Sequence, residues 1–339
     1  MNRRHHVLST LRLDPAAMQR GVSLIELMVA LVIGLFMMGG AITVYLKARD
    51  TYATTDATAR LQENARYALS VIETDVRMSD FWGLTNRYDT ITTDGSSTFP
   101  STCGATFATD ATNYVTGTNN TYSLPSSTCG GYGAGAQANS DVLVTRHASA
   151  TRLTYTASPI AVADRNRVLV ITSRTAGDIF VPKDNSNWVS ATFSGSAGVG
   201  LAATPPLLDL RQMNVSAYYV SQDSSVAAGY PGLRRKYLIT GPAVSDEEIL
   251  PGVENLQFQL GVDTNGDGTA DLFVNPGSVP AGGTPVSVRV WLLLRAQDLD
   301  VSYTSSSALV FADQNIAAPG DHYRRMLVAK TIQLRNARP

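Results

Sequence analysis

The sequence has little charge and few of the residues that carry most enzyme chemistry. Charged residues make up 16% of the 339 residues, histidine occurs four times and cysteine twice. With 27 basic against 28 acidic residues there is no basic excess to collect phosphates, so nucleic acid is not an expected partner. No G-x-S-x-G, H-E-x-x-H or P-loop pattern occurs, and no small-molecule substrate is indicated. We expect no enzyme activity, and we expect His147 and His322 at the surface or at strand edges.

Cys103 and Cys129 lie in the Ser/Thr/Gly-rich stretches "STFPSTCGATF" and "LPSSTCGGYG", with no histidine beside either. This setting favours a disulfide that closes a surface loop, provided that the domain sits in an oxidising compartment. Such a bond would stabilise the fold by about 3 kcal/mol. Two buried or reduced thiols are the alternative.

The longest apolar run lies near the N-terminus, from Val22 to Leu46, and follows a basic segment at 1–21. As a helix the run is roughly 37 Å long, enough to cross a hydrocarbon core of about 30 Å. The basic segment should stay on the cytoplasmic side while the bulk of the chain crosses the inner membrane. One acid, Glu26, interrupts the run, although a charge at membrane depth costs at least about 3 kcal/mol.

The stretch "RGVSLIELMVALVIG" resembles the class III signal of type IV pilins and type II secretion pseudopilins. The run is too long for an ordinary secretory signal, and no A-x-A-like site follows it. The resemblance implies that a prepilin peptidase cuts after Gly21 and removes the leader 1–21. It also implies that Val22 becomes the N-methylated first residue and that Glu26 falls at the fifth position.

The cut would place the new amine of Val22 in the same apolar layer as the carboxylate of Glu26, where each charge needs an opposite one. The amine could meet its own Glu26, or the Glu26 of the next subunit in a staggered stack of helices. The family is thought to use the second pairing to set the assembly register. The alternative is a plain membrane anchor with an incidental glutamate.

The rest of the sequence predicts an α+β fold. Apolar residues recur at spacings of three and four after Leu46, so we expect one long helix over 22–82, with 22–46 in the membrane. Its second half should pack on a mostly antiparallel, β-rich globular domain at 83–339, with a loop-rich insert at about 85–140. The helix stripe comprises Leu61, Ala65, Ala68, Leu69, Ile72 and Val76. The predicted strands are "DVLVTRH", "RLTYTA", "RVLVIT", "DIFVP", "WVSATF", "NVSAYYVSQ", "RRKYLIT", "VENLQFQLGV", "ADLFV", "VSVRVWLLLRAQ" and "MLVAKTIQLRNA".

The later runs "VENLQFQLGVDTNGDGTADLFV", "VSVRVWLLLRAQ" and "RRMLVAKTIQLRNAR" resemble PilW-type minor pilins. The resemblance implies a complex with other minor pilins that primes assembly of the major pilin, at the pilus tip on the cell surface, beneath a large adhesin. A J-type pseudopilin of type II secretion is an alternative. A membrane-tethered periplasmic enzyme or an independent adhesin is a third hypothesis.

The stretch "DTNGDGTAD" is the one candidate for metal binding. Its spacing matches a calcium loop, with Gly268 at the sharp turn and a carbonyl oxygen in place at the seventh position. Val274 stands where that loop needs a bidentate Glu, and the flanks are predicted strands, so a plain turn rich in Asp, Asn and Gly is equally open. No other cofactor is expected. The candidate calcium ligands are Asp263, Asn265, Asp267, Thr269 and Asp271.

Overall fold

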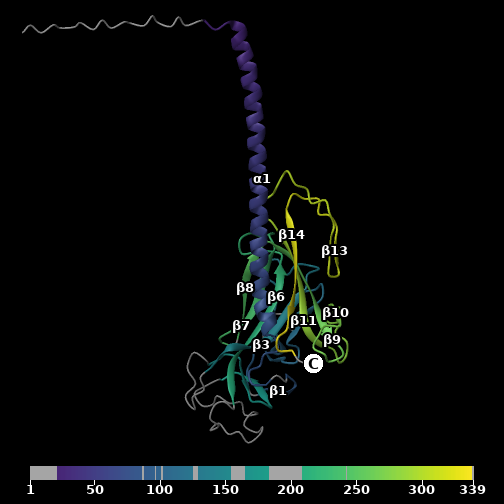
Figure 1. Cartoon of the computed structure of the whole chain (residues 1–339). Coiled ribbons are helices and arrows are strands. Elements are labelled where there is room, and N and C mark those ends of the chain that lie inside the picture. Colours follow the sequence, from purple (N-terminus) through teal and green to yellow (C-terminus); the bar gives the residue numbers. More distant parts are fainter. Residues whose placement is uncertain are drawn as a thin grey trace, which may run out of the picture. The chain divides into compact units, whose positions relative to one another are not determined.

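A computed structural model describes residues 21–85, 88–95, 97–100, 102–124, 129–153, 165–182, 208–241 and 243–337. The chain divides into two compact units, Met1–Thr55 and Asp56–Pro339. Helix α1, Leu24–Met78, contributes to both units (Figure 1). The predicted strand "WVSATF" lies outside the described residues, as does all but the start of "RLTYTA".

The second half of α1 packs on the strands through the predicted apolar stripe. Leu61, Ala65, Ala68, Ile72 and Val76 are buried in one core cluster with residues of the sheets, and Leu69 packs against that cluster. The two alanines leave room for a close approach of the helix to the sheet. The stripe prediction is confirmed.

The helix ends at Met78, four residues before the predicted end. Asp80 adopts a left-handed backbone with φ of 63°, which stops the helical turn. The side-chain amide of Asn336 donates to the carbonyl oxygens of Met78 and Ser79, each at 3.4 Å. Because Asn336 lies far away in the sequence, the local pattern could not show this end.

The larger sheet has eight strands, and all of its pairs are antiparallel except β1 with β5. The path runs β1-β5-β4-β6-β3-β2, and the later part of β6 also pairs with β7, which pairs with β8. The strands are β1 Ile91–Thr93, β2 Val115–Thr118, β3 Val142–Arg152, β4 Leu169–Thr172, β5 Gly177–Phe180, β6 Asp209–Ser221, β7 Gly232–Ile239 and β8 Ala243–Pro251.

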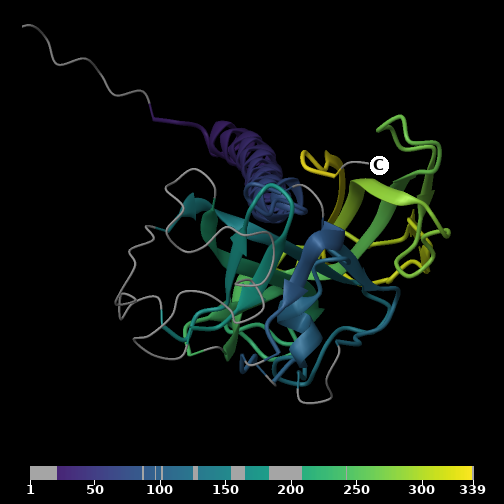
Figure 2. The same cartoon turned by 90° about the horizontal axis from the view of Figure 1, so that it is seen from below.

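The second sheet is antiparallel, with the order β10-β9-β11-β14, and a separate hairpin joins β12 to β13. Figure 2 shows the light-green strands of this sheet, and helix α2, Ala105–Thr109, in blue. A 3-10 turn, η1, covers Tyr88–Thr90. The remaining strands are β9 Val253–Asp263, β10 Leu272–Val274, β11 Thr284–Arg295, β12 Leu309–Phe311, β13 Gln314–Ile316 and β14 Arg325–Gln333.

Both sheets contribute to the core that α1 covers, so the α+β prediction is confirmed. The described part of the predicted loop-rich insert contains η1, β1, α2 and β2. Gly83, just after α1, has φ of 101°, and a Cβ there would meet Asp209 and Thr172 side-chain oxygens at 2.8 Å. The chain therefore needs glycine where it leaves the helix.

Candidate assembly site

The predicted cleavage site lies directly before α1. Gly21 and Val22 are exposed and not helical, and Ser23 precedes the first helical residue. The Ser23 hydroxyl oxygen accepts a hydrogen bond from the backbone N–H of Glu26 at 3.2 Å, as an N-cap residue does. The helix therefore starts just beyond the bond that the resemblance marks for cleavage.

The first part of α1 presents apolar side chains all round and buries none of them. Every residue from 21 to 46 is exposed, and Phe36 is 79% exposed. Within the described residues, one helix is long and apolar enough to cross a membrane, and it is α1. Burying each large apolar side chain is worth about 1.5–3 kcal/mol, so this surface needs lipid or other helices around it.

Glu26 lies in the first turn of α1 and is exposed. Its carboxylate makes no ion pair or side-chain hydrogen bond within the described part of the chain. A negative charge near a helix N-terminus gains only about 0.3–1 kcal/mol from the helix dipole. That gain is smaller than the cost of at least about 3 kcal/mol at membrane depth, so capping alone does not account for Glu26.

Two family models match the chain. The prokaryotic N-terminal methylation motif matches residues 17–42, which contain Gly21, Val22 and Glu26. The model described as type IV pilus-assembly protein W matches residues 217–336, from β6 to just beyond β14. The chain is a type IV pilin-like protein. Searches of the curated proteins and of the solved structures each gave no match.

The two matches confirm the predicted resemblance to PilW-type pilins. They support a type IV pilus-related pilin, a class of structural component, and α1 is long and apolar enough for the membrane anchor that such a protein has. The matched W region contains the whole second sheet and the strands β7 and β8 of the larger sheet. The insert that holds the cysteines lies outside it.

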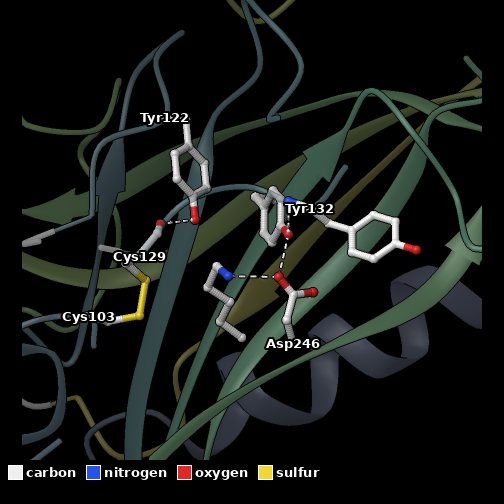
Figure 3. The surroundings of a disulfide bond; sticks show 7 residues. Cys103, Tyr122, Cys129, Tyr132 and Asp246 are labelled. Carbon is white, nitrogen blue, oxygen red and sulfur yellow. Dashed lines mark hydrogen bonds and ion pairs between the residues drawn. A yellow bond between two sulfur atoms is a disulfide. The ribbon is translucent and has the colours of Figure 1, made fainter. Parts of the chain in front are cut away.

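The pilin-like protein contains the predicted disulfide, which joins Cys103 to Cys129 (Figure 3). The two Cα atoms are 4.6 Å apart, and both cysteines are buried. The Tyr122 hydroxyl donates to the backbone carbonyl oxygen of Cys129 at 2.7 Å. The Tyr122 ring also packs edge-on against the Tyr219 ring, with centroids 5.1 Å apart. The segment that the disulfide closes is therefore also held to β6 by an aromatic contact.

The disulfide segment leads into a charged network on β7 and β8. The Tyr219 hydroxyl accepts from the Tyr132 backbone N–H at 3.1 Å and donates to an Asp246 carboxylate oxygen at 2.5 Å (Figure 3). Lys236 Nζ and Arg234 Nε lie 2.7 Å from the two oxygens of the same carboxylate. Burial opposes ionisation of Asp246, but these partners outweigh it and hold the pKa below its usual value.

In the candidate calcium turn between β9 and β10, the carboxylates accept hydrogen bonds from backbone N–H groups of the turn itself. Asp263 accepts from the N–H groups of Asn265 at 3.0 Å and Gly268 at 2.6 Å, and Asp267 accepts from that of Thr269 at 2.8 Å. Asp271 accepts from the backbone and hydroxyl of Thr264. Among the residues that the structure describes, no group of three or more His, Cys, Asp and Glu side chains is placed to hold a metal. Calcium binding here is a proposal for experiment.

One acid of α1, Asp75, faces the sheet. It accepts from the Tyr218 hydroxyl on β6 at 2.7 Å, and Arg235 NH1 on β7 lies 3.8 Å away. Burial opposes ionisation of Asp75, but the nearby His147 and the hydrogen bond from the Tyr218 hydroxyl outweigh it and lower the pKa. Asp75 is therefore an ionised contact between helix and sheet, which the periodicity of the apolar stripe did not reveal.

The prediction for His147 was wrong. His147 lies inside β3, is 5% exposed, and places Nε2 3.8 Å from an Asp75 oxygen. Its Nδ1 lies 2.8 Å from the Ala148 carbonyl oxygen. The alternation of β3 turns this residue toward α1, where a strand-end position was expected. His322 is exposed in a loop as predicted, with Nδ1 2.6 Å from the Tyr303 carbonyl oxygen.

Sequence reasoning also missed a cluster of side-chain amides around Asp313. The amides of Asn119, Asn120 and Asn275 donate to one carboxylate oxygen of Asp313, at 2.8, 3.0 and 2.8 Å. The cluster ties the turn of the β12–β13 hairpin to the loop after β2 and to the end of β10. Its members are up to 194 residues apart in sequence, so no local motif marks it.

Proposed function

We propose that this pilin is a minor pilin of PilW type that primes pilus assembly in a complex with other minor pilins, at or near the pilus tip. Its partners would be the other minor pilins, the major pilin, a large tip adhesin and, during maturation, a prepilin peptidase. Before assembly it would sit in the inner membrane as a single pass, with its N-terminus in the cytoplasm. The W-type match and the methylation motif support this proposal.

The observation that carries the proposal is the carboxylate of Glu26 at the start of the apolar first part of α1, where every residue up to 46 is exposed. A cut after Gly21 would create an amine at Val22, four positions before Glu26. In the apolar interior of a filament, the two charges stabilise each other only if they form an ion pair. Pairing between neighbouring subunits would set the stagger between them, while the exposed apolar surface would supply most of the binding energy.

The test is Glu26→Ala in the full-length chain, with Glu26→Gln as a variant of similar shape. Cleavage and methylation are followed by sequencing and mass spectrometry of the N-terminus. Both variants should still be cut after Gly21, because the Ser23 cap uses the backbone of residue 26 and not its side chain. Pilus numbers should fall at least about tenfold, because the Val22 amine would be left as an unpaired charge in the apolar layer, at a cost of about 3 kcal/mol, and 1.4 kcal/mol already corresponds to tenfold.

Glu63→Ala is the matched control, because Glu63 is an exposed acid of the same helix outside the apolar run. It should leave pilus numbers unchanged. Normal pilus numbers in Glu26→Ala would contradict the pairing between subunits. A pull-down of the mature chain with the other minor pilins tests the priming complex itself, and failure to recover any of them would count against that part of the proposal.

A further inference from the structure

A polar cleft of about 760 Å³ lies in the globular unit, where the ends of the two sheets meet the β12–β13 hairpin. That volume is within the range of small-ligand sites. One wall comes from the loop before β3 and the β6–β7 connection, and the other from β9, β11, β13 and the start of β14. Hydrogen-bonding side chains line most of it: Gln137, Asn139, Gln222, Asp223, Glu254, Asn255, Arg295, Gln314, Asn315 and Arg325.

The charged side chains of the cleft are already matched. Glu254 lies between two guanidinium groups, 2.6 Å from Arg325 Nε and 3.3 Å from Arg295 NH1. The other side of Arg325 contacts Asp321 at 2.6 Å. Asp223 accepts the backbone N–H groups of Ala134 and Gly229, both at 2.7 Å. Both guanidinium groups are thus paired with carboxylates, and the carboxylates already accept hydrogen bonds, so the cleft favours a ligand that binds through neutral groups.

Several neutral groups of the cleft are free to bind. The side-chain amides of Gln137, Asn139 and Asn315 make no hydrogen bond within the described part of the chain. An amide that the fold leaves without a hydrogen bond keeps its donors and its acceptor for a ligand.

We propose that this cleft binds a short, neutral oligosaccharide. Each amide presents a donor and an acceptor side by side, and a sugar ring carries adjacent hydroxyls that both donate and accept. An extended peptide is usually held by a sheet edge and by apolar pockets for alternate side chains. The apolar side chains here are mostly small alanines and prolines, with Leu293 and Ile316 the largest, and they make no such series of pockets. This inference does not depend on the role in pilus assembly.

The experiment uses the mature full-length chain with its disulfide intact, in lauryldimethylamine oxide micelles, because a maltoside detergent would itself present sugars. Maltotriose, cellotriose and chitotriose are titrated separately by calorimetry, and saturation-transfer NMR identifies the bound protons. At least one of the three should bind with a Kd of about 1 mM or tighter. No binding of any of them at a concentration of about 20 mM would overturn the proposal.

The variants Gln137→Ala and Asn315→Ala test whether the sugar binds in the cleft. Each removes one amide that makes no hydrogen bond to the described residues, so the melting temperature should change little. Each should weaken trisaccharide binding about three- to tenfold. Gln62→Ala, on the exposed face of α1, is the matched control and should bind like the wild type. Wild-type affinity in both cleft variants would overturn the location.

Two further probes test the ligand class. Trigalacturonate, an acidic trisaccharide, should bind no better than the neutral sugars, and tighter binding would overturn the inference from the matched charges. The neutral hexapeptide Gly-Ser-Gly-Ser-Gly-Ser should not bind. Peptide binding that Gln137→Ala weakens, without sugar binding, would show that the cleft is a peptide site and would overturn the proposal.

Discussion

Replacing both cysteines, Cys103→Ala with Cys129→Ala, should lower the stability of the globular unit by an amount that follows from the loop that the bond closes. The two residues are 26 positions apart. In the chain-entropy model, a loop of that length in the unfolded chain corresponds to about 3.5 kcal/mol at 25 °C. For a unit of this size, 1 kcal/mol shifts the melting temperature by about 2 °C, so we expect a loss of about 7 °C.

The assay is thermal melting of the mature chain in detergent micelles, followed by near-ultraviolet circular dichroism. Reductant gives an internal control, because it should lower the melting temperature of the wild type and leave that of the double variant unchanged. Without the disulfide, the near-ultraviolet signal of the Tyr122–Tyr219 ring pair should also fall in part before the main transition. The reason is that the Tyr122 hydroxyl is hydrogen-bonded to the backbone of Cys129. A shift below about 1 °C, with the disulfide verified by mass spectrometry in the wild type, would refute the loop-entropy reasoning.

Three further predictions concern the globular unit. Asp75→Asn should destabilise the fold by about 3 kcal/mol in urea titrations, because it leaves Arg235 and Tyr218 without the ionised partner on α1; unchanged stability would contradict the docking role. Burial raises the pKa of Asp80 to about 7, despite the hydrogen bond that it accepts from Trp82. The folded state therefore holds this proton more tightly than the unfolded state, and the stability that Asp80 contributes is lost as the pH rises from about 4 to about 7. The melting temperature of Asp80→Asn should therefore rise relative to that of the wild type as the pH rises from 5 to 8. A difference between the two melting temperatures that stays constant over this range would contradict the prediction. If the 263–271 turn binds calcium, 1 mM calcium should raise the melting temperature by a few degrees over chelator, and equal midpoints would contradict calcium binding.

The sequence was informative wherever the signal was local or periodic. The long helix follows from spacings of three and four in the stripe from Leu61 to Val76, which α1 buries as predicted. Strands such as β9 and β11 follow from dense β-branched and aromatic runs, and both are present. The disulfide was predictable because its cysteines stood in polar loop sequence without any histidine nearby.

Strand β8 shows what local patterns could not provide. Its sequence, "AVSDEEILP", contains three consecutive acids, which are poor strand formers in isolation. In the fold these acids lie opposite the basic run of β7, with Asp246 against Lys236 and Glu247 against Arg235. The cross-strand charge pairs offset the weak intrinsic preference, and such pairing is visible only once the two strands are adjacent.

The two parts of the molecule differ in how their acidic side chains are partnered. In the globular unit the buried acids have partners in the fold: Asp75 has Tyr218, and Asp246 has Lys236 and Arg234. Glu26 has no such partner among the described residues, and the apolar residues around it are exposed. A carboxylate without a partner among the described residues, set in an apolar surface that the fold leaves exposed, points to a partner outside the chain, and the pilin match makes another pilin subunit the natural candidate.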